Sequence, residues 1–135
     1  MAIFEGHLET QRTGMRLAML ARMPGAVVSR MAEVDTVFDL EARTVERQRR
    51  LLFGLCGHTE RFAFTDIKGL GLKEYIDTDD STWRSYLPVL TLRDGSRRYL
   101  AVLNAAATPY ARAIEDICRQ TGIPRLDHPG NKWGW

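Results

Sequence analysis

The sequence predicts an α+β fold made mostly of antiparallel strands and completed by one C-terminal helix. Three observations lead to this prediction. Segments in which apolar and polar residues alternate, the pattern of half-buried strands, occupy much of the chain. Two apolar segments flank an Asp-Gly turn signal at residues 94–95. The last periodic segment, residues 109–121, has the spacing of an amphipathic helix instead.

The composition is that of one ordinary globular domain. The chain has 135 residues, of which 44% are hydrophobic and 27% charged, and its net charge is +2. No apolar run approaches the roughly 20 residues of a membrane helix, and the N-terminus has no secretory pattern. The mild charge gives no indication of nucleic-acid binding. Cys56 and Cys118 are too few for a disulfide framework, so we expect free thiols and a cytoplasmic location.

Residues 1–31 allow two interpretations. Every second residue from Met15 to Met23 is apolar, which indicates a strand, but the same stretch is rich in good helix formers. The turn signal at Thr13-Gly14 favours a hairpin over a short helix. We expect this unit to attach to a core at residues 32–125, with residues 126–135 as the tail of the same single domain.

The first half of that core has the pattern of an antiparallel sheet. Residues 34–40 alternate, a short turn follows at residues 41–44, and residues 45–53 are expected to return as a strand. Gly54 and the Gly-His-Thr sequence at residues 57–59 are expected to break this strand.

The next strand is expected to start at Phe62 and Phe64 and to continue, after Asp66, to Ile76. Gly69 and Gly71 lie inside it. Glycines within a strand predict a bulge, a sharp bend or close packing beneath another element.

Asp94-Gly95 predicts a two-residue type I′ turn between two apolar strands. Because both faces of this hairpin carry apolar pairs, we expect it to be covered on both sides. Pro88 lacks a ladder donor and so favours an edge strand or a bulge. The predicted cross-strand pairs are Val89–Leu100 and Leu87–Val102 on one face, and Leu92–Arg97, Leu90–Tyr99 and Tyr86–Leu103 on the other.

The terminal helix has clear start and stop signals. Thr108 is the expected N-cap and Pro109 the first helical residue, while Gly122 and Pro124 end the helix. One continuous apolar stripe should dock on the sheets. It consists of Tyr110, Ala113, Ile114, Ile117, Cys118 and Thr121.

Several of these motifs together resemble the bacterial pleckstrin-homology-like (PH-like) domains. The motifs are the strand and turn from Phe38 to Val45, the aromatic-x-aromatic-x-Asp-Ile step at residues 62–67, the Asp-Gly hairpin and the last helix, within residues 32–126. The resemblance implies a partly open barrel of two near-orthogonal sheets capped by the helix. Many relatives carry membrane helices beside the domain, which this chain lacks.

The densest basic stretch suggests two roles. In lipid-binding relatives, a basic residue near the first turn followed by a basic-x-Arg pair grips anionic headgroups, and the resemblance puts this chain's arginines in that position. Alternating arginines on an exposed strand also solubilise a sheet edge, which is the interpretation we favour. The anion-binding candidates are Arg43, Arg47, Arg49 and Arg50.

Other polar motifs give weaker indications of chemistry. Cys56 and His58 could supply two metal ligands, but a zinc site needs three or four. The acidic run at residues 77–80 lacks the glycine and distal glutamate of a calcium loop. We therefore predict no metal, no cofactor and no catalytic residue; an enzyme or ligand carrier would have to use Cys56, His58 and Asp66 at the barrel mouth.

The function favoured by the sequence is a non-enzymatic binding or scaffold module that contacts another protein or itself. Apolar hairpin faces and C-terminal tryptophans that require cover support this prediction. The alternative is binding to an anionic membrane surface through Arg43, Arg47 and Arg49. The tryptophans dock either on their own domain or on a partner. The partner-interface candidates are Leu87, Val89, Leu100, Val102, Trp133 and Trp135.

Overall fold

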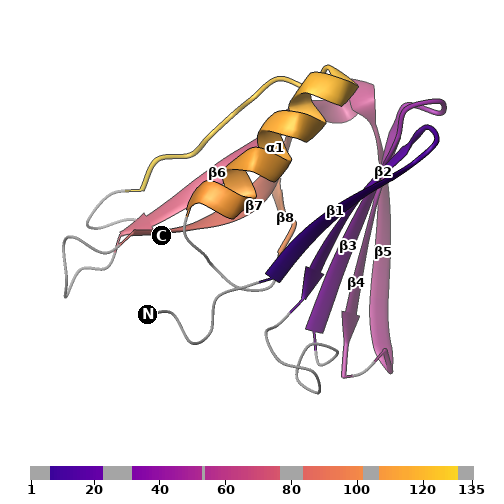
Figure 1. The fold of residues 1–135 in the computed structure, drawn as a ribbon, viewed down its shortest axis with the longest axis horizontal. Helices are drawn as coiled ribbons and strands as arrows, with labels where there is room; N and C mark the ends of the chain where they lie inside the picture. Colours follow the sequence, from indigo (N-terminus) through magenta and orange to yellow (C-terminus); the bar gives the residue numbers. More distant parts are fainter. Residues whose placement is uncertain (1–6, 23–31, 53, 77–83, 102–106, 131–135) are drawn as a thin grey trace.

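The computed structural model describes residues 7–22, 32–52, 54–76, 84–101 and 107–130 (Figure 1). It confirms the predicted class, with mostly antiparallel strands in two sheets, one C-terminal helix and a barrel that is not closed. The elements are β1 (His7–Thr13), β2 (Arg16–Arg22), β3 (Ala32–Asp39), β4 (Thr44–Leu51), β5 (Cys56–Ala63), the 3₁₀ turn η2 (Phe64–Asp66), β6 (Ile67–Ile76), β7 (Arg84–Leu92), β8 (Arg97–Tyr99) and α1 (Ala107–Thr121).

The strands form two sheets in chain order. The first sheet contains β1 to β5 and the second contains β6, β7 and β8, with every neighbouring pair antiparallel. Residues 7–22 form the hairpin β1–β2, so the strand interpretation of this region is confirmed. Because β2 pairs with β3, the hairpin extends the first sheet.

Strand β5 corrects the sequence prediction. β4 ends at Leu51, two residues before its expected end, and the predicted break at residues 57–59 lies inside β5. Phe62 is near the end of β5 and Phe64 lies in η2, so neither starts a strand. The cause is that β5 is an edge strand with largely exposed side chains. Its position depends on backbone pairing with β4, not on apolar alternation.

The predicted register of the β7–β8 hairpin is wrong by one residue. Leu90 lies opposite Arg98 and Val89 opposite Tyr99, while the Leu100 N–H donates to the Pro88 carbonyl over 2.9 Å. The loop has three residues because Gly95 alone has a positive φ, of 90°, and its N–H donates to the Leu92 carbonyl over 3.0 Å. A type I′ turn would need a positive φ at Asp94 as well.

This register separates residues that the sequence prediction had grouped. Val89 and Leu100 now lie on opposite faces of the second sheet, and both are fully buried. Pro88 lies in the central strand β7 and within a regular stretch of pairing, which differs from both predicted alternatives, an edge strand and a bulge. The strand accommodates it because β8 ends at Tyr99, beside the position where Pro88 lacks a donor.

Helix α1 packs its predicted stripe against both sheets. It contacts β6 and β7 as well as β1, and in Figure 1 it lies along the second sheet on the side of β1. It begins at Ala107, two residues before the predicted start, and ends where Gly122, at φ 79°, donates its N–H to the Cys118 carbonyl. One core results, which includes Met19, Phe38, Val45, Leu70, Leu90, Leu100, Tyr110, Ile114 and Ile117.

The segment after α1 covers the free edge of β6. The Leu70 N–H donates to the Pro124 carbonyl over 2.9 Å, and the Leu126 N–H donates to the Leu70 carbonyl over 3.1 Å. Gly69 and Gly71 make this approach feasible: a β-carbon on Gly71 would lie 2.0 Å from the Leu126 carbonyl oxygen. Of the three alternatives predicted for these glycines, close packing is found at both, and the pairing register also shifts between Ile67 and Gly69, as in a bulge.

The same segment also reaches the outer face of the second sheet. A β-carbon on Gly69 would meet the side chain of Leu126, and His128 Nε2 lies 2.8 Å from Thr91 Oγ1. Burial and the charges of Arg97 and Lys73 lower the pKa of His128. The C-terminal segment thus supplies part of the second cover that the hairpin was expected to need.

Candidate functional site

The arginines predicted to bind an anion are distributed over both faces of β4. Arg47 points inward and is buried, whereas Arg50 lies on the opposite face and pairs with Glu33 over 2.9 Å and with Asp35. Arg49 shares the face of Arg47 but is exposed, and Arg43 lies in the β3–β4 turn. The four side chains do not converge on one site.

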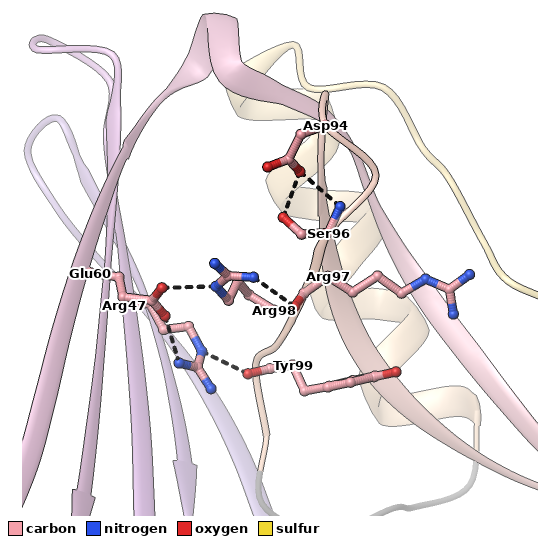
Figure 2. A network of polar contacts seen from close by, with 7 residues as sticks. All are labelled: Arg47, Glu60, Asp94, Ser96, Arg97, Arg98 and Tyr99. Carbon is pink, nitrogen blue, oxygen red and sulfur yellow. Dashed lines mark hydrogen bonds and ion pairs between the residues drawn. The ribbon is translucent and has the colours of Figure 1, made fainter.

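Arg47 belongs to a polar bridge between the two sheets, formed by Arg47, Glu60 and Arg98 (Figure 2). The Arg47 Nη1 lies 3.1 Å from one carboxylate oxygen of Glu60, and Arg98 Nε lies 2.8 Å from the other. Arg47 Nε also donates to the Tyr99 carbonyl over 2.8 Å. The bridge therefore joins β4 and β5 of the first sheet to β8 of the second.

Electrostatics in the polar bridge favour a charged carboxylate. Burial alone would raise the pKa of Glu60, but the hydrogen bond and charge of Arg98, together with Arg47, lower it overall. Burial lowers the pKa of Arg47, and Glu60 opposes that change. Thr36, opposite Arg47 on β3, is also buried, and its hydroxyl has no hydrogen-bond partner. Arg47, Glu60 and Arg98 thus connect the two sheets at a partly buried position.

The most exposed apolar group in the described chain is the leucine tip, which we define as Leu51, the last residue of β4, with Leu52 and Leu55 in the turn to β5. These residues are 38%, 52% and 85% exposed. Leu52 adopts φ 53°, which is unusual for a non-glycine residue, and the Leu55 N–H donates to the Leu52 carbonyl over 3.1 Å. The backbone thus directs a cluster of leucines outward at one end of the first sheet.

Sequence reasoning missed the leucine tip because it assigned residues 45–53 to one strand. A signal was available in the run Leu-Leu-Phe-Gly-Leu at residues 51–55, where three apolar residues precede a glycine. Turns are normally polar, so an apolar run at a strand end indicates either a longer strand or an exposed contact surface.

The remaining candidates occupy separate places. Cys56 and His58 are exposed at the start of β5, while Asp66 lies in η2 beyond the end of that strand. Among residues 7–22, 32–52, 54–76, 84–101 and 107–130, no three acidic, histidine or cysteine side chains form a metal-binding group. The acidic run at residues 77–80 lies outside the described residues.

Of the partner-interface candidates, Val89 and Leu100 are fully buried within the chain and Leu87 is half-buried. Val102, Trp133 and Trp135 lie outside the described residues. Within the part of the chain that the structure describes, no helix has the length and apolarity needed to cross a membrane.

Comparisons of this chain with protein-family models, with curated proteins and with solved structures find no match. The exposed leucine tip and the positions of the arginines are therefore the observations from which we infer a function.

Proposed function

We propose that this chain is a non-enzymatic binding module of the PH-like kind, which contacts a protein, in the simplest case a second copy of itself, through the leucine tip. The main supporting observation is that Leu51, Leu52 and Leu55 are exposed together where β4 ends and the chain turns towards β5. Isolated exposed leucines are ordinary, but a cluster of them is typical of a contact surface. The predicted hairpin candidates Val89 and Leu100 are buried, so the leucine tip is the better-supported surface.

The rest of the fold supports this role as a scaffold. Two sheets and the docked helix α1 share a single core, which agrees with the expected PH-like arrangement. Binding residues commonly lie on loops that a rigid scaffold positions. The strained φ of Leu52 is consistent with a turn selected for what it presents.

Light scattering across a concentration series tests self-association. We expect the wild-type chain to form a dimer that the double substitution Leu52→Ser with Leu55→Ser weakens at least tenfold. Met15→Ser is the matched control, because Met15 is 49% exposed but lies in the β1–β2 turn. A wild-type chain that stays monomeric at millimolar concentration, or a double variant that dimerises normally, would contradict self-association through the leucine tip.

A second candidate function, contact with an anionic bilayer, is favoured by the exposure of Arg49 two residues before the leucine tip. No described carboxylate forms an ion pair with Arg49. Leucines that enter the interface beside a cation would combine apolar burial with attraction to acidic lipids. Arg47 is buried in the polar bridge, and Arg43 lies at the other end of β4, so Arg49 would carry this contact.

Sedimentation with phosphatidylserine vesicles tests the bilayer alternative. Binding should weaken with salt and fall several-fold in Arg49→Gln and in Leu55→Ser. Arg61→Gln provides a control, because Arg61 is an exposed arginine on β5 paired with Glu46 over 2.6 Å. If neither Arg49→Gln nor Leu55→Ser changes vesicle binding, the bilayer alternative is excluded.

A further inference from the structure

A hollow of about 310 Å³ lies at the end of the first sheet opposite to the leucine tip. The β3–β4 turn, η2, the β7–β8 turn and the end of α1 surround it. Two arginines line it, Arg43 from the first turn and Arg93 from the second, together with Phe64, Thr65, Ile123 and Pro124. Four separate parts of the chain thus meet at one place that neither proposed contact surface uses.

Local contacts hold both arginines in position. The guanidinium carbon of Arg43 lies 5.3 Å from the centroid of the Phe64 ring, and the Phe64 N–H donates to the Arg43 carbonyl over 2.9 Å. Arg43 also has a positive φ, of 56°. Arg93 Nε donates to the Thr65 carbonyl over 2.5 Å, and the Arg93 backbone N–H donates to the Asp66 carbonyl over 2.9 Å. No described residue accepts a hydrogen bond from the terminal N–H groups of either guanidinium.

The charge of these two arginines is not balanced by a carboxylate among the described residues. Some exposed arginines do pair with one, as Arg16 does with Asp39 over 3.9 Å and Arg61 with Glu46 over 2.6 Å. Others, such as Arg49 and Arg97, form no ion pair with a described carboxylate, so what distinguishes Arg43 and Arg93 is that both line one hollow. The C-terminal end of α1 adds partial negative charge near the hollow, and Asp66 is exposed beside it. Two full positive charges exceed the single charge of Asp66 and the partial charge of the helix end together, which leaves a net positive site suited to an anion.

We propose that this hollow binds a phosphomonoester, with the phosphate between Arg43 and Arg93 and the carbon body against Ile123 and Pro124. A single guanidinium can bind both oxygens of a carboxylate through two parallel N–H groups. A phosphomonoester has three terminal oxygens and nearly two negative charges, so it can bind two guanidiniums at once. The volume is at the lower end of the range for small-molecule sites, roughly 300–1,000 Å³, so more than free phosphate can be held. Thr65, which is exposed, also lines the hollow.

Amide NMR titrations with phenyl phosphate, inorganic phosphate and benzoate test this site. Phenyl phosphate should shift the amides of Thr65, Gly122 and Ile123, and it should bind about tenfold more tightly than either of the other two probes. Arg43→Gln and Arg93→Gln should each weaken phenyl phosphate binding about tenfold or more. Arg112→Gln is the matched control, because Arg112 is an exposed arginine on α1, and it should leave binding unchanged.

Three results would overturn the proposal: no amide shifts around the hollow, equal affinity for all three probes, or unchanged binding in Arg43→Gln. Arg93→Gln could unfold the chain, because the Arg93 side chain also holds η2 through the Thr65 carbonyl. Arg43→Gln is then the decisive variant, because the Arg43 side chain is exposed and, among the described residues, makes its only ring or polar contact with the Phe64 ring. A lysine at position 43 keeps the charge but loses the planar fork, and should bind with intermediate affinity.

Discussion

Arg47 and Arg50 show how two residues three positions apart on one strand acquire different roles. The strand places them on opposite faces, where Arg47 joins the polar bridge and Arg50 pairs with Glu33 and Asp35 on the outside. The sequence indicates a basic strand at this point, but it cannot indicate which arginines are neutralised. That depends on Glu60, 13 residues from Arg47, and on the Tyr99 carbonyl, 52 residues away.

The polar bridge predicts an acid-sensitive contribution from Glu60. Its pKa in the folded chain is lower than in the unfolded chain, so its stabilisation is complete above the ordinary glutamate pKa of about 4.3 and is lost as the pH falls through the lower folded value. Glu60→Gln should lower the free energy of unfolding at pH 7 by about 1–3 kcal/mol, because two arginines lose a shared partner. Urea unfolding measured from pH 7 to pH 3 should show that the difference in the free energy of unfolding between Glu60→Gln and wild type becomes smaller as the pH falls.

Glu46→Gln is the matched control for this measurement. Glu46 pairs with the exposed Arg61 at the surface of the same two strands, and exposed pairs contribute about 0–1 kcal/mol. If Glu60→Gln and Glu46→Gln cause equal losses, or if the Glu60→Gln difference does not depend on pH, the polar bridge does not stabilise the fold as described.

At the scale of single elements, the sequence predicted best where periodicity and packing agree. The α1 stripe was predictable because helical spacing set its buried face, and Tyr110, Ile114 and Ile117 are nearly or fully buried. The hairpin register was not, because Asp94 can also accept hydrogen bonds from the backbone N–H and hydroxyl of Ser96, as Figure 2 shows, with distances of 2.8 Å and 2.6 Å. That alternative turn adds one residue to the loop and shifts every following pair.

The docking of residues 124–128 on β6 was only half predictable. Gly69 and Gly71 indicated that some element packs closely there, yet no residue pattern identified the C-terminal segment as that element. A β-carbon at Gly71 would overlap the Leu126 backbone, so Gly71→Ala should displace the segment and lower the free energy of unfolding by more than about 2 kcal/mol. Thermal unfolding together with amide exchange at Leu70 and Leu72 measures both effects.

Gly57→Ala is the control for this substitution, because a β-carbon there meets its nearest atom, the Arg49 carbonyl oxygen, at an ordinary 3.6 Å. It should leave stability within about 0.5 kcal/mol of wild type or raise it slightly. If Gly71→Ala and Gly57→Ala are equally stable, the docking of residues 124–128 does not depend on the absence of a side chain at Gly71.

At the scale of the whole molecule, one core and the polar bridge connect two sheets that do not close into a barrel. The core reaches from β2 and β3 through α1 to β6 and β7, whereas the polar bridge connects β4 and β5 to β8. The two proposed surfaces then lie at opposite ends of β4, with Arg43 before its first residue and the leucine tip starting at its last residue, Leu51. A rigid strand between them allows each site to be tested without disturbing the other.

This arrangement predicts that both sheets unfold together when the helix is loosened. Ile114 is fully buried in the shared core, so Ile114→Ala should lower the free energy of unfolding by about 2–5 kcal/mol and reduce amide protection in β3 as much as in β7. Denaturant-dependent amide exchange measures both strands in one experiment. Glu115→Ala, on the exposed side of the same helix turn, should change neither. Loss of protection in β7 with unchanged protection in β3 would show instead that the first sheet is stable by itself and that α1 supports only the second.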